Sequence, residues 1–322
     1  MTRFFFNQLI AGALVGAGLS AGAANAAGTG RLLFVNPTSG EMIGGGLDRQ
    51  GYFQQAFDIN LPAEKGRDTL ISTSAGIIAY SWANGGGQAY LMDASGSIKP
   101  GAYSAFSPKW TNMLDFGPYA LFYNLNGNTA DGAVVGVNRD GTLTQTYTAT
   151  NFSPWTTIGA TDNYLFFYNK PNGRYTIASI DVNGALSQYT AAASRHAGYT
   201  NFASVGDDVL LWSFSTGSWE SGAVTYAHLP AQDAYVVAAV SQPTSTSLSG
   251  YNLAVASNEH LLLYNSATGA AMTAHFKQSL QGTPGTFIPD RTFTLPKYFT
   301  FLARCGQFLA FYGLGVGQVQ FG

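Results

Sequence analysis

Residues 155–190 read WTTIGATDNYLFFYNKPNGRYTIASIDVNGALSQYT. Short apolar or aromatic runs alternate here with turn residues, a pattern typical of short strands rather than of a helix. The stretch predicts four strands, at residues 155–158, 164–168, 175–180 and 186–190. Turns that end in Gly173 and Gly184 separate the last three strands. Glycine suits these positions because it adopts a positive φ without a Cβ clash.

The last of these turns recurs at a nearly constant spacing. Its glycines are Gly51, Gly96, Gly141 and Gly184, which lie 45, 45 and 43 residues apart. A fixed period in this range indicates a repeat architecture. The run of the second predicted strand also recurs, in seven copies at residues 32–36, 76–80, 121–124, 165–169, 209–213, 261–265 and 308–312.

A third recurring feature precedes most of these runs, an aromatic residue usually followed by Thr or Asn. The copies are Trp110-Thr111, Trp155-Thr156, Tyr199-Thr200, Tyr251-Asn252 and, more loosely, Tyr298-Phe299-Thr300. Four antiparallel strands per repeat predict an all-β fold, a β-propeller of four-stranded blades. The coils of a β-helix are shorter, and the strands of a β-sandwich do not repeat as a unit. We expect one propeller domain over residues 27–322, with seven blades and six as the alternative.

The first 26 residues have the features of a secretory signal peptide. Arg3 supplies a positive charge, residues 4–21 are uncharged and mainly apolar, and Ala24-Asn25-Ala26 fits a small-x-small cleavage site. Asn7, Gln8 and several glycines interrupt the apolar stretch, which argues against the alternative of an uncleaved anchor. We expect a secreted or periplasmic protein, and no later segment is long and apolar enough to span a membrane.

Composition excludes some classes of partner. The chain has 15 Lys and Arg and 17 Asp and Glu, without a basic stripe, so we expect no nucleic-acid partner. Cys305 is the only cysteine, which excludes an intrachain disulfide and predicts a buried structural thiol. Aromatic residues make up 14% and charged residues 10% of the chain, a balance that suits an aromatic core and a surface for neutral ligands such as sugars.

Signatures of catalysis are missing from the sequence. There is no G-x-S-x-G, H-E-x-x-H, Walker or C-x-x-C motif. The four histidines, His196, His228, His260 and His275, follow no ligand spacing, so we interpret them as surface or loop residues and predict no metal or cofactor. The pair Asp207-Asp208 is a weak candidate for acid–base work, with solvated turn residues as the alternative interpretation. We therefore predict no catalytic residue.

The recurring aromatics are the better candidates for ligand binding. An exposed ring can stack on the C–H face of a sugar, and equivalent sites would add avidity. The favoured alternative is that these rings pack between neighbouring blades, because large aromatics dominate core packing. Trp82 and Trp219 lie in loop-like Gly and Ser surroundings, which makes them candidates for exposed contacts. The predicted ligand-binding residues are Trp110, Trp155, Tyr199, Tyr251, Trp82 and Trp219.

The order aromatic-Thr, Leu-Phe-Phe-Tyr-Asn, Gly-containing turn and Asp/Asn-x-x-Gly-x-Leu resembles the repeats of tachylectin-type propellers. It is also similar to bacterial propeller lectins, most clearly over residues 110–190. Those relatives bind carbohydrate, so the resemblance implies a non-enzymatic, lectin-like protein with a carbohydrate or glycoconjugate partner. A scaffold that binds proteins or belongs to the cell envelope is the main alternative. A periplasmic hydrolase or lyase that acts on glycans is the third, because a fold alone does not establish a function.

Overall fold

The protein is described here from a computed structural model, which covers residues 3–5 and, with gaps, residues 31–321. The described residues form strands and turns, without a helix. The chain divides into two compact units. The first consists of Met1–Asn124, Asp131–Thr150 and Tyr298–Gly322, and the second of Leu125–Ala130 and Asn151–Lys297.

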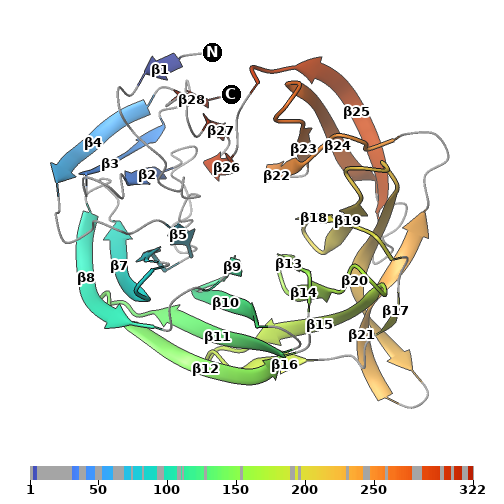
Figure 1. The fold of residues 1–322 in the computed structure, drawn as a ribbon, viewed down its shortest axis with the longest axis horizontal. Coiled ribbons are helices and arrows are strands. Elements are labelled where there is room, and N and C mark those ends of the chain that lie inside the picture. Colours follow the sequence, from blue (N-terminus) through green and yellow to red (C-terminus); the bar gives the residue numbers. More distant parts are fainter. Residues whose placement is uncertain are drawn as a thin grey trace. The chain divides into compact units, whose positions relative to one another are not determined.

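Four antiparallel sheets lie wholly or mainly in the first unit (Figure 1). Three of them have four strands, and the sheet β2-β3-β4 has three within the described residues. The first sheet contains β2 (Arg31–Val35), β3 (Glu41–Leu47) and β4 (Phe53–Asn60), and the second contains β5 (Thr69–Ser72), β6 (Ile77–Tyr80), β7 (Gly86–Met92) and β8 (Ile98–Ala105). The third contains β9 (Asn112–Phe116), β10 (Tyr119–Asn126), β11 (Thr129–Val137) and β12 (Leu143–Phe152), and the fourth joins β1 (Arg3–Phe5) to β26 (Phe301–Cys305), β27 (Phe308–Gly313) and β28 (Gln318–Phe321).

Three further antiparallel sheets make up the second unit. The sheet named E here contains β13 (Thr157–Ala160), β14 (Leu165–Tyr168), β15 (Arg174–Ile180) and β16 (Leu186–Gln188), with β17 (Ala193–Ser194) paired to β15. Sheet F contains β18 (Asn201–Val205), β19 (Asp208–Trp212), β20 (Trp219–Leu229) and β21 (Gln232–Ser241). Sheet G contains β22 (Leu253–Ser257), β23 (His260–Tyr264), β24 (Ala270–Lys277) and β25 (Thr286–Thr294).

This arrangement confirms the predicted all-β fold of repeated antiparallel blades. The four strands expected in residues 155–190 appear as β13 to β16, and the first begins at Thr157 rather than Trp155. Each of the seven predicted apolar runs falls on a strand of a different sheet. Arg3–Phe5, within the predicted signal peptide, forms β1 against β28, while residues 6–26 lie outside the described part, so cleavage stays a prediction. Cys305 ends β26, and its side chain also lies outside that part.

The second strand contributes four buried apolar residues to the core in the sheets of β6, β10, β14, β19 and β23. All four residues of β6 and of β14, and all five of β19, are buried. Side chains alternate between the two faces of a strand, so such a run must be covered on both sides. Between sheets E and F, for example, Phe166 stacks on Phe202 with ring centroids 5.2 Å apart. Burial of these rings removes a large apolar area from water and stabilises the stack of sheets.

A glycine turn closes the hairpin after β6, β14, β19 and β23. The N–H groups of Gly85, Gly173, Gly217 and Gly269 each donate a 2.8 Å hydrogen bond to the carbonyl of the residue four positions earlier. All four glycines have a positive φ, between 71° and 81°. This conformation favours glycine because it brings Cβ of other residues close to a carbonyl oxygen.

Two glycine substitutions separate backbone strain from steric contact. Gly206 and Gly269 both have a positive φ, but a Cβ on Gly206 meets nothing within 4 Å, whereas one on Gly269 would press against the Leu295 carbonyl oxygen. We expect Gly206→Ala to lower the free energy of unfolding by about 1–2 kcal/mol, the cost of the left-handed backbone. Gly269→Ala should lower the free energy of unfolding clearly more, because the steric contact adds to the backbone strain. Urea denaturation of both variants measures the difference, and equal losses would contradict the contact with Leu295.

Candidate functional site

The predicted ligand-binding aromatics are mostly buried. Trp110, Trp155, Tyr199 and Trp219 expose only 4–6% of their surface, and Tyr251 is partly buried. Trp219, expected in an exposed loop, starts β20 and packs edge-on against Phe287 of sheet G at 4.9 Å. Trp82 lies outside the described residues. A buried ring has no free face on which a sugar can stack.

Hydrogen bonds to the backbone explain why the second strands of sheets E, F and G end in tyrosine or tryptophan. In sheets E, F and G, the last residue of the second strand reaches the backbone at or just before the next copy of the aromatic motif. The Tyr199 N–H donates to the Tyr168 hydroxyl at 3.3 Å, Trp212 Nε1 donates to the Tyr251 carbonyl at 2.7 Å, and the Tyr264 hydroxyl donates to the Pro296 carbonyl at 2.6 Å. Burial raises the pKa of the Tyr168 hydroxyl, which favours its neutral form.

The Thr or Asn that follows the aromatic residue also has a structural role. Its side-chain oxygen accepts a hydrogen bond from a backbone N–H 14 residues later, in the glycine turn of the same sheet. The three pairs are Lys170 N–H to Thr156 at 2.7 Å, Phe214 N–H to Thr200 at 3.2 Å and Ser266 N–H to Asn252 at 2.9 Å. The recurring dipeptide therefore fixes the first strand of a sheet to its own turn.

A truncation can test this structural interpretation. Trp155→Ala should lower the free energy of unfolding by about 3–5 kcal/mol, because it leaves a cavity in the core. Thr156→Val should lower this free energy by about 1–2 kcal/mol, since it removes a hydroxyl that accepts a hydrogen bond from the Lys170 N–H and donates one to the Tyr168 carbonyl. The control is Phe214→Ala, whose ring is 46% exposed and whose loss should change stability little. Unfolding in urea, followed by tryptophan fluorescence or circular dichroism, distinguishes these outcomes.

An open cavity of about 540 Å³ lies between sheets F and G, at the start of β18 and beside the glycine turn of sheet G. Its lining is uncharged and consists of Thr200, Asn201, Phe214, Gly250, Asn252, Asn265, Ser266 and Ala267. Several of its polar groups already bind within the protein. Asn201 Nδ2 donates to the Asn252 carbonyl at 3.1 Å, and Asn252 Nδ2 donates to the Ser266 hydroxyl at 3.0 Å. The cavity consequently has little polar capacity left for a ligand.

Asp207 and Asp208, considered for acid–base work, link sheet F to both of its neighbours in the second unit. Asp207 accepts hydrogen bonds from Thr161 and Asn163, each at 2.9 Å, in the turn before β14. Asp208 is buried and accepts a 2.8 Å bond from the N–H of Gly285, next to β25. The two carboxylates thus point to different sheets, and this geometry favours a structural role over a catalytic pair.

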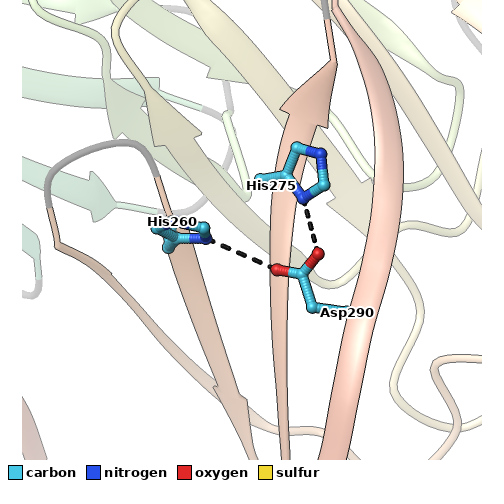
Figure 2. A network of polar contacts seen from close by, with 3 residues as sticks. All are labelled: His260, His275 and Asp290. Carbon is cyan, nitrogen blue, oxygen red and sulfur yellow. Dashed lines mark hydrogen bonds and ion pairs between the residues drawn. The ribbon is translucent and has the colours of Figure 1, made fainter.

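Three ligating side chains do meet on sheet G. His275 Nδ1 lies 2.6 Å from Asp290 Oδ1, and His260 Nδ1 lies 3.4 Å from Asp290 Oδ2. Figure 2 shows the carboxylate reaching toward both rings from the neighbouring strand. The side chains of His260, His275 and Asp290 are 59%, 33% and 29% exposed, so solvent reaches them. They form the one group of three or more such residues found in the described part of the chain.

Strand register brings the two histidines together. His260 begins β23 and pairs directly with His275 on β24, which places both rings on the same face of the sheet. Their neighbours Leu261 and Ala274 point to the other face and pack into the core shared with Leu210 and Trp212 of sheet F. The histidine backbone is therefore fixed from behind, while the rings point away from that core.

A β-bulge adds the third residue. β24 and β25 pair Thr273 with Arg291 and Ala274 with Pro289, so the register skips Asp290. Such an extra residue bends its strand and redirects a side chain, which is why bulges are common beside active sites. Here the Asp290 carboxylate lies beside His275.

Sequence reasoning missed this group because the histidines were compared by spacing alone. The predicted run at residues 261–265 and the glycine turn after it already defined a hairpin. Pairing residues symmetrically about that turn would have placed His260 opposite His275, as observed. The position of Asp290 depends on the bulge and has no comparable signal in the sequence.

Asp140 and Asp115, both in the first unit, have shifted pKa values. Hydrogen bonds from the backbone and hydroxyl of Thr142, at 2.9 and 2.7 Å, lower the pKa of Asp140 in an exposed turn. Desolvation raises the pKa of Asp115 on β9. Neither belongs to a group of three metal-ligating residues within the described part, so sheet G provides the candidate site.

No protein-family model matches the chain, and no curated protein matches its sequence. Solved structures do match its fold. The periplasmic gluconolactonase PpgL of Pseudomonas aeruginosa is 12% identical with a TM-score of 0.62, and the match covers 91% of both chains. BamB of Moraxella catarrhalis is 12% identical with a TM-score of 0.51, over 100% of this chain and 98% of BamB. A Bacteroides fragilis protein provisionally named a 6-phosphogluconolactonase is 12% identical with a TM-score of 0.59, over 93% and 92% of the two chains.

These matches establish the β-propeller fold and correct one prediction. The sequence predicted a non-enzymatic, lectin-like protein with pockets formed by the recurring aromatics. That prediction is wrong: the similar structures include a gluconolactonase, and the rings of Trp110, Trp155, Tyr199 and Trp219 are buried. Among the described residues, no helix is long and apolar enough to cross a membrane.

Proposed function

We propose that this propeller is a hydrolase of small cyclic esters, with its reaction centre at His260, His275 and Asp290. The observation that supports this most is the meeting of two imidazoles and a carboxylate, whose ligating atoms lie within 4.8 Å of one another on a solvent-accessible face. The names of fold neighbours, a gluconolactonase among them, indicate the substrate class. Because of the predicted signal peptide, we also propose that the protein acts outside the cytoplasm, as a secreted or periplasmic enzyme.

The chemistry required is the activation of water. A water molecule held among the three side chains has a proton acceptor close by, and loss of its proton makes it a nucleophile. The oxygen then forms a bond to the lactone carbonyl carbon, and the ring C–O bond breaks. The ring oxygen takes up a proton, so lactone and water together give one hydroxy acid. Acid–base assistance of this kind typically accelerates a reaction by about 10²–10⁴-fold.

The positive charge of Lys277 would stabilise an anionic transition state or product. Lys277 lies two residues beyond His275 on β24, so its side chain leaves the same face of the strand. A cation there would favour the negative charge that develops on the carbonyl oxygen during attack. Lactones that carry a phosphate would gain more from Lys277 than neutral lactones.

The test is hydrolysis of δ-gluconolactone, its 6-phosphate and γ-butyrolactone, followed by acid release in a pH-stat after subtraction of the uncatalysed rate. Asp290→Asn and His275→Gln should lower kcat/KM by about 10²-fold or more, because each removes a proton acceptor at the site. Asp162→Asn is the matched control, because Asp162 is an exposed turn carboxylate near sheet E. Wild-type rates no faster than buffer for all three lactones would refute the proposal.

A further inference from the structure

We propose that His260, His275 and Asp290 bind one divalent transition-metal ion, with Zn²⁺ the best match. The proposal uses the same residues as the proposed hydrolysis and names the agent that activates water there. Metal binding can be measured directly and does not depend on which substrate is hydrolysed.

The donor set selects the class of metal. Two imidazole nitrogens and one carboxylate oxygen suit Zn²⁺ and its neighbours, whereas Ca²⁺ and Mg²⁺ prefer sites built from oxygen alone. Catalytic zinc sites commonly have three protein ligands of these types and a water molecule in the fourth position. The open side of the group on sheet G, where His260 is 59% exposed, leaves room for that water.

The distances are close to those of a metal site. Tetrahedral bonds of about 2.0–2.1 Å place ligand atoms roughly 3.3 Å apart. The contact between His260 and Asp290, at 3.4 Å, already has this separation. His275 Nδ1 meets the other carboxylate oxygen, Oδ1, in a hydrogen bond of 2.6 Å, which must widen by roughly 0.7 Å if Oδ1 binds the metal. A carboxylate that binds through Oδ2 must instead turn so that this oxygen faces both rings, and one ligand atom from each residue lies within 4.8 Å of the others. Small rotations of partly exposed side chains provide these shifts.

The backbone beneath the ligands is held in place. The two histidines are opposite one another in a continuous ladder between β23 and β24, and the residues behind them are buried in the core. Sites on rigid strands keep their ligands closer to the required geometry than sites on loops. The Asp290 carboxylate already forms a hydrogen bond with the His275 ring. A metal ion would take the place of the proton in that hydrogen bond.

The experiment uses the purified full chain without an affinity tag, freed of metal with a chelator. Isothermal titration with ZnCl₂ gives stoichiometry and affinity, and visible absorption of added Co²⁺ reports the coordination geometry. The variants are His260→Gln, His275→Gln and Asp290→Asn, and the matched control is His228→Gln on β20. Circular dichroism of each variant checks that the sheets are intact.

The expected result is one ion per chain, tetrahedral Co²⁺ absorption, and binding weakened in the three variants but not in the control. The loss should be at least tenfold, since removal of even an outer-shell partner of a ligand costs about 10–100-fold in affinity. Absence of saturable binding by the wild-type chain, or equal affinity in all four variants, would overturn the proposal.

Lactone assays on the same samples separate the two proposals. Zinc binding without hydrolysis of any lactone supports the metal site and refutes the proposed reaction. Hydrolysis that persists in the metal-free chain, with no binding of Zn²⁺ or Co²⁺, supports the reaction and overturns the metal site.

Discussion

The second unit depends on a hydrogen bond between the last residue of each second strand and the backbone of the segment that, along the chain, leads to the next sheet. Tyr168, Trp212 and Tyr264 each make it with their one polar atom, while their rings fill the core. This combination explains why the position requires tyrosine or tryptophan in these sheets. Phenylalanine would supply the packing but leave a buried backbone group without that partner, which costs free energy. The repeat is therefore maintained by hydrogen bonds to buried backbone groups as well as by apolar burial.

In sheet G, the candidate site and the core lie on neighbouring residues of the same strands. One face of β23 and β24 carries Leu261 and Ala274 into the core, and the other carries His260 and His275. The alternation of a strand allows chemistry on one face without disturbance of packing on the other. The face that carries His260 also contributes to packing, because Leu262 and Tyr264, two and four residues further along β23, are buried on it. The candidate site therefore lies at the exposed end of this face, where β23 begins.

Much of the architecture could be predicted because the repeat shows each local rule several times. The glycine turns, the apolar second strands and the four-strand unit all follow from residues 155–190 and their copies. The recurring aromatics were harder to interpret, since a ring that packs and a ring that binds have the same sequence signature. Burial of Trp155 and Tyr199 distinguishes the two, and burial depends on neighbouring sheets. The site was missed because its residues occur once, in one sheet, and because Asp290 joins them only through an irregular register.

That irregularity bears on how the proposed site could be inherited. The bulge consists of a single extra residue, Asp290, between Pro289 and Arg291. Loss of one codon there would restore a regular ladder and remove the carboxylate, while the remaining sheets would be unchanged. Close homologues could then diverge in chemistry through one short deletion rather than through gradual substitution. A one-residue gap at this point of an alignment would mark the branch at which the site was gained or lost.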